Sequence, residues 1–195
     1  MHLSRIAAKL PFQVRLRSVQ QRLNRFLSNS ASQVRSWYRP VAQALLEQAA
    51  AHGPVRLLLD STKVGVAHQL LIVTLAYRKR ALPLVWSWVS GTRGHSDSDQ
   101  QLALLQEIHA LLPAQTSVVV AGDCEFGAVA VIRQLQQWHW HYVLRQKGST
   151  LVCVSHTTFH WQRFDELVPA KQRCFLYCCP HELSLAAIGM YNRHG

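Results

Sequence analysis

Apolar and polar positions in the middle of the chain follow a strand-like pattern in some segments and a helical period in others. Short apolar runs rich in β-branched residues indicate strands, and segments in which apolar residues recur every three or four positions indicate helices. Strands are expected at 55–60, 68–77, 81–89, 118–123 and 142–144. Helices are expected at 99–112 and from Phe126 to Trp138. The order of elements is therefore βββαβαβ.

Two of these strands carry information about their place in the sheet. The run 68–77 is apolar on both faces, so we expect it inside the sheet. The run 81–89 contains Pro83, which has no amide proton for a ladder hydrogen bond and favours an edge position. The large apolar side chains of this run alternate and are expected to share one face: Leu82, Leu84, Trp86 and Trp88.

The first and fourth strands both end in an aspartate. The fourth runs through Gly122 into Asp123, and the first has the same form and ends in Asp60. The order βββαβαβ is the opening of a ribonuclease H-like fold, an α/β fold with a mixed sheet in which the first and fourth strands are parallel neighbours. Because open α/β sheets bind ligands at the carboxyl ends of their strands, we expect Asp60 and Asp123 to lie together at such an edge.

Paired carboxylates at a sheet edge suit a divalent cation. Two carboxylates about 4–6 Å apart repel each other unless a cation neutralises them. Mg²⁺ prefers oxygen ligands and keeps several waters, and two such ions can activate a water and stabilise the leaving oxygen at a phosphate. This arrangement favours phosphodiester chemistry at Asp60 and Asp123. Aspartates at strand ends are common, so a structural role for either one is the alternative.

The sequences on either side of this core have different patterns. Residues 15–27 and a second segment from Gln33 across Pro40 have helical periodicity. After Gly148 the periodicity weakens into short apolar runs, and no helix with an inward carboxylate follows. These changes divide the chain into a basic helical region, a core and a region of short strands, with the limits 1–52, 53–149 and 150–195.

Positive charge is concentrated at the N-terminal end. The net charge of the chain is +11, and residues 1–50 hold eight Lys or Arg against one Glu, which gives 8 − 1 = +7. A basic region favours a polyanionic partner, most simply nucleic acid, with a solvated basic face as the alternative. The residues expected to contact DNA are Arg15, Arg22, Arg25, Arg35 and Arg39. The neighbouring aromatics Trp37 and Tyr38 are expected in the core.

The remaining composition narrows the class of protein. Five cysteines at irregular spacing argue against a disulfide framework and favour a reducing cytoplasm. Zinc is a weaker interpretation than ordinary strand cysteines for Cys174, Cys178, Cys179 and His181, because no C-x-x-C pair is present. No apolar run approaches the roughly 18 residues of a membrane span, and no continuous apolar segment of a signal peptide precedes the core. We expect neither a membrane nor a small-molecule partner.

Short motifs spread over the chain form a recognisable set. In the core they are Leu57–Gly65, His68–Leu70, Arg80–Leu84, Gly94–Ser96, Gly122–Gly127 and Tyr142–Gly148, and before it Arg22–Asn29 and Trp37–Pro40. Together they resemble the bacterial DDE transposases of the insertion-sequence-4 type. The resemblance covers nearly the whole chain, so the regions before and after the core correspond to a DNA-binding region and a partial β-rich insertion.

The resemblance implies a function and residue roles. Members of this family cut one DNA strand with a water nucleophile and join the 3′ hydroxyl to target DNA. Asp60 and Asp123 match the first and second catalytic aspartates, which would ligate two Mg²⁺ ions, for which Mn²⁺ can substitute. Arg145 and Lys147 would contact DNA phosphates, with solvation as the alternative. The implied partners are transposon ends and target DNA, bound by a homodimer in the bacterial cytoplasm at the nucleoid.

The chain departs from the family towards its C-terminal end. The third catalytic acid of the family lies in a helix within a Y-x-x-R-x-x-x-E pattern, which is absent here. Asp165, Glu166 and Glu182 lie among the short strands and are rejected as that acid. Glu125 and Phe126 are expected to be a charge near a helix N-terminus and a core aromatic, and not metal ligands. We therefore expect a transposase truncated within the insertion.

Three functions are open at this point. The first is a DDE transposase with an incomplete site, whose strand cleavage should be weak or absent because two of three ligands bind a metal pair poorly. The second is a catalytically inactive transposase remnant that binds DNA through residues 1–52. The third is an unrelated ribonuclease H-like nuclease.

Overall fold

The structure is a computed structural model that describes the chain in segments. The backbone is described at residues 3–11, 14–65, 68–90, 96–153, 161–166, 173–179 and 182–190. Side chains are described within these segments up to residue 150 and at 163–166. The chain divides into two compact units, Met1–Pro40 and Val41–Gly195, and each is described by itself. The limits at residues 52 and 149 stay predictions.

The first unit is helical. It contains α1 (Leu3–Ala7), α2 (Leu16–Leu27) and the first turns of α3 (Val34–Ala50). The pattern at 15–27 predicts α2, whereas the five residues of α1 are too few to show a period. In α2 Val19 is buried, and the Phe26 ring lies 5.4 Å from that of Trp37 between centroids. Trp37 is nevertheless 53% exposed, so the expectation that it belongs to the core is wrong.

The third helix runs through Pro40 and continues into the second unit. A proline inside a helix lacks the amide proton for one helical hydrogen bond, yet α3 extends without interruption to Ala50. The segment therefore forms one helix and not two. In the second unit its buried residues are Ala42 and Leu46, which are fully inaccessible to solvent.

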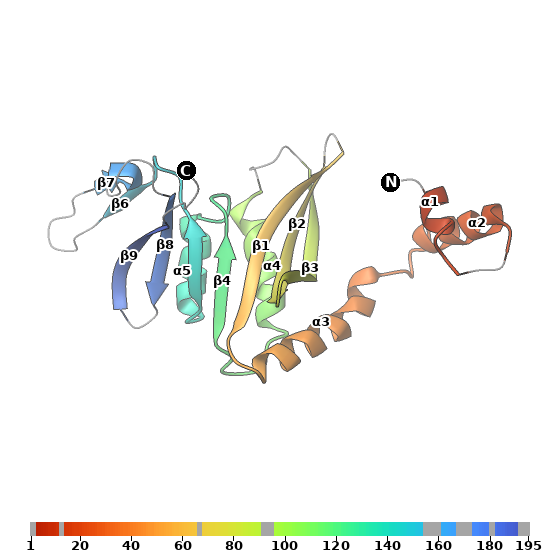
Figure 1. The fold of residues 1–195 in the computed structure, drawn as a ribbon, viewed down its shortest axis with the longest axis horizontal. Coiled ribbons are helices and arrows are strands. Elements are labelled where there is room, and N and C mark those ends of the chain that lie inside the picture. Colours follow the sequence, from red (N-terminus) through yellow and green to blue (C-terminus); the bar gives the residue numbers. More distant parts are fainter. Residues whose placement is uncertain are drawn as a thin grey trace. The chain divides into compact units, whose positions relative to one another are not determined.

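Seven strands among the described residues form one mixed sheet in the order β3-β2-β1-β4-β5-β8-β9 (Figure 1). They are β1 (Val55–Val64), β2 (His68–Tyr77), β3 (Arg80–Ser90), β4 (Val118–Gly122), β5 (His141–Arg145), β8 (Arg173–Cys179) and β9 (Glu182–Met190). β4 is parallel to both β1 and β5, and the other neighbours are antiparallel. The predicted α/β class, the order βββαβαβ, the inner place of β2 and the edge place of β3 are confirmed.

The strands after residue 150 have two different arrangements. β6 (Leu151–Cys153) and β7 (Trp161–Arg163) pair only with each other, whereas β8 and β9 extend the main sheet beyond β5. A 3-10 helix at Phe164–Glu166 follows β7, and in it Asp165 forms an ion pair with Arg163 at 2.7 Å. The cysteine side chains at 174, 178 and 179 and residue His181 lie outside the described part.

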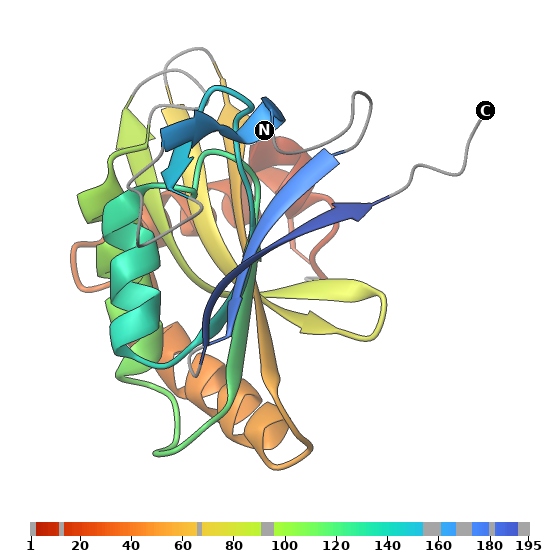
Figure 2. The ribbon, with the colours of Figure 1, turned by 90° about the vertical axis from the view of Figure 1, so that its left-hand side faces the viewer.

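Two helices cover one face of the sheet (Figure 2). They are α4 (Ser98–His109) and α5 (Val129–Gln137). α4 begins after Asp97, whose side chain accepts a hydrogen bond from the amide of Asp99 and caps the helix. Buried positions alternate with exposed ones along the first part of β1. The buried apolar residues of the two helices pack in the core on this face: Leu104, Leu105 and Ile108 in α4, Val131 and Leu135 in α5. No helix in the described segments has the length and apolarity needed to cross a membrane.

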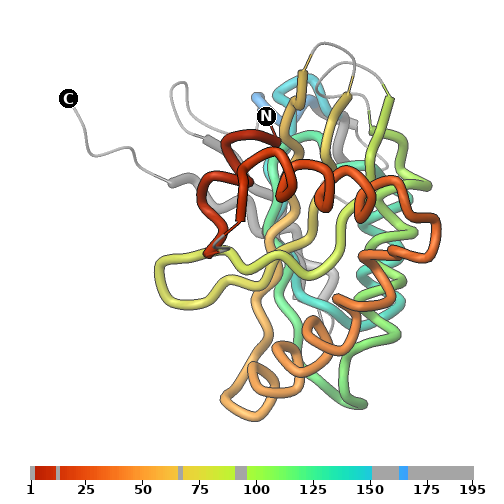
Figure 3. Tube along the Cα trace, turned by 90° about the vertical axis from the view of Figure 1, so that its right-hand side faces the viewer, coloured from red at the N-terminus to blue at the C-terminus, as the bar shows by residue number. Residues whose placement is uncertain are grey.

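The hairpin of β2 and β3 turns away from the rest of the sheet towards its tip (Figure 3). Its register shifts between Val73 and Thr74, where Val73 pairs with Val85 and Thr74 pairs with Pro83. The extra residue on β3 is Leu84, which is a β-bulge. Because the bulge breaks the alternation of faces, Leu84 is buried while Trp88 is 58% exposed. The expectation that both share one face is therefore wrong.

We expect the two faces of β1 to differ in their contribution to stability. Leu57 is fully buried on the face covered by the helices, and its neighbour Leu58 on the opposite face is only partly buried. Leu57→Ala should lower the free energy of unfolding by about 3 kcal/mol, and Leu58→Ala by about 1 kcal/mol. Urea unfolding followed by tryptophan fluorescence measures both values, since five of the six tryptophans belong to the second unit. Equal losses would contradict a core on one face only.

Candidate functional site

The carboxyl ends of the parallel strands bring the two predicted aspartates together. The last residue pair between β1 and β4 is Leu59 with Gly122, and the residues that follow are Asp60 and Asp123. Neighbouring strands lie about 4.8 Å apart, so the two aspartates leave the paired region side by side. Both are exposed. β1 itself continues to Val64 in its pairing with β2, so Asp60 lies within the strand and not at its end.

One oxygen of each carboxylate is oriented by the local backbone. The amide of Ser61 donates to Oδ1 of Asp60 at 2.8 Å. The amide of Glu125 donates to Oδ1 of Asp123 at 2.9 Å, which closes an Asx turn directly after β4. The side chains are therefore held at one oxygen each and face solvent.

A cluster of polar side chains lies beside this edge, around the carboxylate of Glu125. Oε2 of Glu125 accepts from the hydroxyl of Ser61 at 2.6 Å. Oε1 accepts from Nε2 of Gln69 at 3.0 Å, from the amide of Ser96 at 3.2 Å and from the Ser96 hydroxyl. Gln101 completes the cluster, since its Nε2 donates to the Ser96 hydroxyl at 2.9 Å and to the Glu125 carbonyl at 3.2 Å. We call these five residues the Glu125 cluster.

The hydrogen bonds of the cluster keep Glu125 ionised. Burial of the carboxyl raises the pKa of Glu125, but the hydrogen bonds from Ser61, Ser96 and Gln69 lower it by more in sum. The net pKa of Glu125 therefore lies below its ordinary value of 4.5. At neutral pH the cluster contains a negative charge that is solvated by protein donors and not only by water.

Three buried amides near the edge are incompletely paired. Oε1 of Gln69, Oε1 of Gln101 and Nε2 of Gln146 have no hydrogen-bond partner among the described residues. Gln146 lies two residues beyond Leu144, the partner of Gly122 in β5. Its amide packs against Gly127, where an added Cβ would lie 2.5 Å from Nε2. Gly127 thus leaves the space that the Gln146 side chain occupies.

The donor set fits a magnesium ion in part. Asp60 and Asp123 supply carboxylate oxygens, and their exposure leaves room for metal-bound water. The oxygens of Glu125 are taken up by hydroxyl, amide and backbone donors, so this carboxylate does not add a third ligand. In the part of the chain that the structure describes, no three His, Cys, Asp or Glu side chains form a group that could hold a metal.

The basic residues expected to contact DNA belong to two groups. Arg145 ends β5, next to the residue that pairs with Gly122, and both Arg145 and Lys147 are exposed. The first unit holds eight Lys or Arg and no Asp or Glu, which gives +8, and all eight are exposed. They include the five arginines expected to contact DNA: Arg15, Arg22, Arg25, Arg35 and Arg39.

Glu125 does not lie at a helix N-terminus as expected, and the cluster around it is missing from the sequence-based predictions. α5 begins at Val129 with no acidic residue in its first turn, so Glu125 lies in the preceding turn and not at the helix N-terminus. Phe126 is fully buried, as expected. The sequence contains one signal for this cluster, because two otherwise apolar patterns each include a glutamine. Gln69 lies within β2, and Gln101 lies on the same stripe of α4 as its buried leucines. Polar residues at such positions predict a buried partner.

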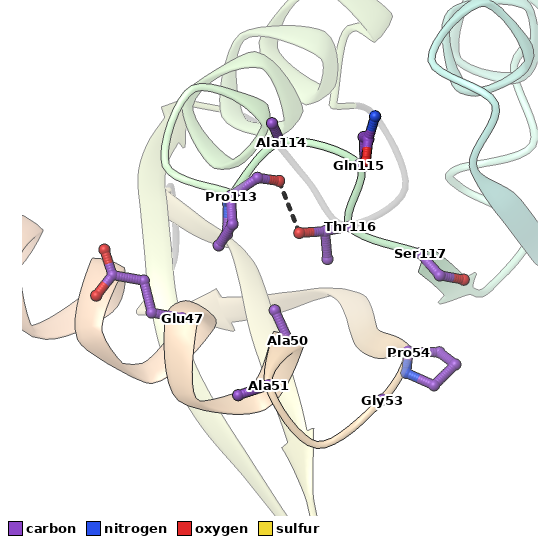
Figure 4. A pocket seen from close by; sticks show the side chains of 10 residues that line it. All are labelled: Glu47, Ala50, Ala51, Gly53, Pro54, Pro113, Ala114, Gln115, Thr116 and Ser117. Atoms are coloured by element: carbon purple, nitrogen blue, oxygen red, sulfur yellow. Dashed lines mark hydrogen bonds between the residues drawn. The ribbon is translucent and has the colours of Figure 1, made fainter.

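A hollow lies at the opposite end of β1 and β4, between the end of α3 and the segment before β4 (Figure 4). Its lining residues are Glu47, Ala50, Ala51, Gly53, Pro54, Pro113, Ala114, Gln115, Thr116 and Ser117. Within this lining the Thr116 hydroxyl donates to the Pro113 carbonyl at 2.6 Å. With Glu47 as the one carboxylate in its lining, this hollow offers no paired acids.

Comparison with known proteins finds no family model that matches the chain and no match among curated proteins.

The lowered pKa of Glu125 predicts a pH-dependent contribution to stability. A carboxyl whose pKa is lower in the folded than in the unfolded state stabilises the fold above its unfolded pKa, and this stabilisation disappears as pH falls through the folded pKa. We therefore expect the stability difference between the wild type and Glu125→Gln to be constant above about pH 5.5 and to shrink below about pH 4.5. Urea unfolding of both proteins across this range measures it. A difference that grows on acidification would contradict the assignment.

Proposed function

We propose that this chain acts in DNA transposition, as a protein related to the DDE transposases of the insertion-sequence-4 type. In this proposal Asp60 and Asp123 are the carboxylates of a metal site, and the first unit binds DNA. The observation that carries the proposal is the parallel pairing of β1 with β4, which ends at Leu59 and Gly122 and leaves the two aspartates as neighbours.

The topology supports a ribonuclease H-like fold for the second unit. Three antiparallel strands, β3-β2-β1, continue through β1 into the parallel strands β4 and β5, and α4 and α5 lie on one face. This is the order expected for that fold from the sequence. Fold alone does not determine function, so the proposed function rests on the paired carboxylates and the nearby basic residues.

Each group at the edge has a distinct task in this proposal. Asp60 and Asp123 would hold Mg²⁺, which supplies an activated water and stabilises the leaving oxygen of a phosphodiester. Arg145 follows the residue of β5 that pairs with Gly122, and its guanidinium is a group that binds phosphate oxygens through N–H donors. Lys147 follows it and is exposed to the same solvent.

The charge of the first unit supports DNA as the polyanion. Its eight exposed cations without a single acid can neutralise several phosphates, and each neutralised phosphate releases condensed counterions. Such binding is independent of base sequence and sensitive to salt. A solvated basic face with no partner would give neither property.

DNA binding without cleavage is the second candidate, and one observation favours it. The described residues supply two carboxylate ligands, whereas a pair of metal ions needs more, and Glu125 is committed to its own hydrogen bonds. A nicking assay on supercoiled DNA with Mg²⁺ or Mn²⁺ separates the two candidates. Robust cleavage that is lost in Asp60→Ala would exclude the non-catalytic candidate.

The metal site predicts that Mn²⁺ binding depends on both aspartates. In titrations followed by electron paramagnetic resonance, Asp60→Asn and Asp123→Asn should each reduce Mn²⁺ binding below detection, because each removes a charged oxygen ligand. Glu47→Gln is the matched control, since this exposed carboxylate lines the hollow at the opposite end of β1 and β4. Binding by Asp60→Asn at the wild-type affinity would remove the basis of the site.

The DNA-binding role predicts that charge reversal in the first unit makes DNA affinity less dependent on salt. In the full chain, Arg22→Glu with Arg25→Glu should weaken binding to duplex DNA and lower the slope of log affinity against log salt by about 2. Lys79→Glu with Arg133→Glu makes the same change in net charge in the second unit and should have a smaller effect. Fluorescence anisotropy at several salt concentrations measures both. An identical response of the two double variants would show that only net charge matters.

A further inference from the structure

The two aspartates differ in how firmly the sheet holds them. Asp60 belongs to β1 and pairs with Ile72 of β2, so its backbone is fixed by the ladder. Asp123 follows the last paired residue of β4, and the backbone from Asp123 to Ala128 belongs to neither a helix nor a strand. Within this turn the Phe126 amide donates to the Asp123 carbonyl at 3.2 Å. The position of the Asp123 carboxylate therefore depends on what fixes the turn.

Three hydrogen bonds connect the two carboxylates through Ser61 and Glu125. The Ser61 amide donates to Asp60 at 2.8 Å, and the Ser61 hydroxyl donates to the Glu125 carboxylate at 2.6 Å. The Glu125 amide in turn donates to Asp123 at 2.9 Å. The side chains of Asp60 and Ser61 lie on opposite faces of β1, so the Ser61 hydroxyl lies on the covered face of the sheet. The Ser61 amide donates to the exposed Asp60 carboxylate.

The Glu125 side chain is also anchored from two other elements. Gln69 of β2 and Ser96 before α4 donate to its second oxygen, and Gln101 of α4 holds both Ser96 and the Glu125 carbonyl. Gln69, Gln101 and Ser61 are all nearly inaccessible to solvent. Charge-assisted hydrogen bonds in such a partly desolvated place are stronger than those between neutral groups. The turn is thus tied to β1, β2 and the segment before α4 through the Glu125 carboxylate, and to α4 through the Glu125 carbonyl.

We propose that Ser61 and Glu125 are positioning residues that hold the Asp123 carboxylate in place relative to Asp60, an inference that rests on the proposed metal site. Neither residue gives an oxygen to the metal. They set the separation of the two ligands, which otherwise repel each other as like charges just beyond the last residue pair of β1 and β4. Outer partners of this kind typically change metal affinity by about 10–100-fold when they are removed.

The test measures hydrogen exchange of the turn and Mn²⁺ affinity, both on the full chain. Ser61→Ala removes the link from β1, and Glu125→Gln replaces one acceptor oxygen by a donor. Both should lower the protection of the residue 125 amide proton against hydrogen exchange about tenfold, because its bond to Asp123 loosens. Both should also weaken Mn²⁺ binding about tenfold. Hydrogen exchange by NMR needs no metal, so it reports on the turn alone.

A matched control removes a buried hydroxyl that is not part of the cluster. Thr74 of β2 is buried, and its hydroxyl donates to the Leu58 carbonyl at 3.4 Å. Thr74→Val keeps the shape of the side chain and should leave exchange at residue 125 and Mn²⁺ binding unchanged. An equal effect of Thr74→Val and Ser61→Ala would assign the losses to general destabilisation and overturn the proposal.

The remaining outcomes separate this inference from the proposed function. If the Glu125 amide proton in Ser61→Ala exchanges at the wild-type rate, the positioning role is overturned. Faster exchange combined with unchanged Mn²⁺ affinity also overturns it, provided that Asp60→Asn abolishes Mn²⁺ binding. If the wild type and Asp60→Asn bind Mn²⁺ equally, the metal site fails and the positioning role fails with it, while the exchange data still decide whether Ser61 holds the turn.

Discussion

The parallel pairing of β1 with β4 is the constraint on which the rest of the second unit depends. Five residue pairs, from Val55 with Val118 to Leu59 with Gly122, join segments that are about 60 positions apart in the sequence. Parallel strands need a long crossover, and here β2, β3 and α4 form it. The pairing is stabilised by side chains buried against the helices, so the two aspartates become neighbours only when this whole crossover has packed. A site built this way depends on the core for its geometry.

The turn after β4 is fixed by the packing of one residue and the hydrogen bonds of the residue before it. At Gly122 an added Cβ would lie 3.1 Å from the Phe126 ring and 3.2 Å from the Leu144 side chain, so these two side chains leave no room for a side chain at this position. Phe126 therefore packs against the strand end that it follows, and the preceding residue Glu125 is held by Ser61 and Gln69. Apolar packing and a charged hydrogen-bond cluster act on consecutive residues, which leaves the Asp123 turn little freedom.

Periodicity predicts the elements of the core well, because each buried strand or amphipathic helix shows its pattern within its own residues. The edge position of β3 follows from Pro83 alone, since a missing amide proton is a local property. The errors have a different origin. The bulge at Leu84 changes which face a side chain joins, and the Glu125 cluster joins residues from β1, β2, α4 and a turn. Neither a bulge nor a contact between distant segments leaves a period in the sequence. Gln69 and Gln101 indicate that a buried partner exists, but only the structure shows that it is Glu125.

The charges near the edge limit how a phosphate can approach it. Asp60, Asp123 and the ionised Glu125 give three negative charges around one strand end, with Arg145 as the nearest cation along the neighbouring strand. In the proposed function, a phosphodiester at this edge would therefore meet repulsion at the carboxylates, although the chain as a whole carries +11. Long-range attraction and local repulsion are compatible only if a cation lies between phosphate and carboxylates. Because solvation of Glu125 is supplied by protein donors, that cation would be held by Asp60 and Asp123, and DNA binding and metal binding at this edge should strengthen each other.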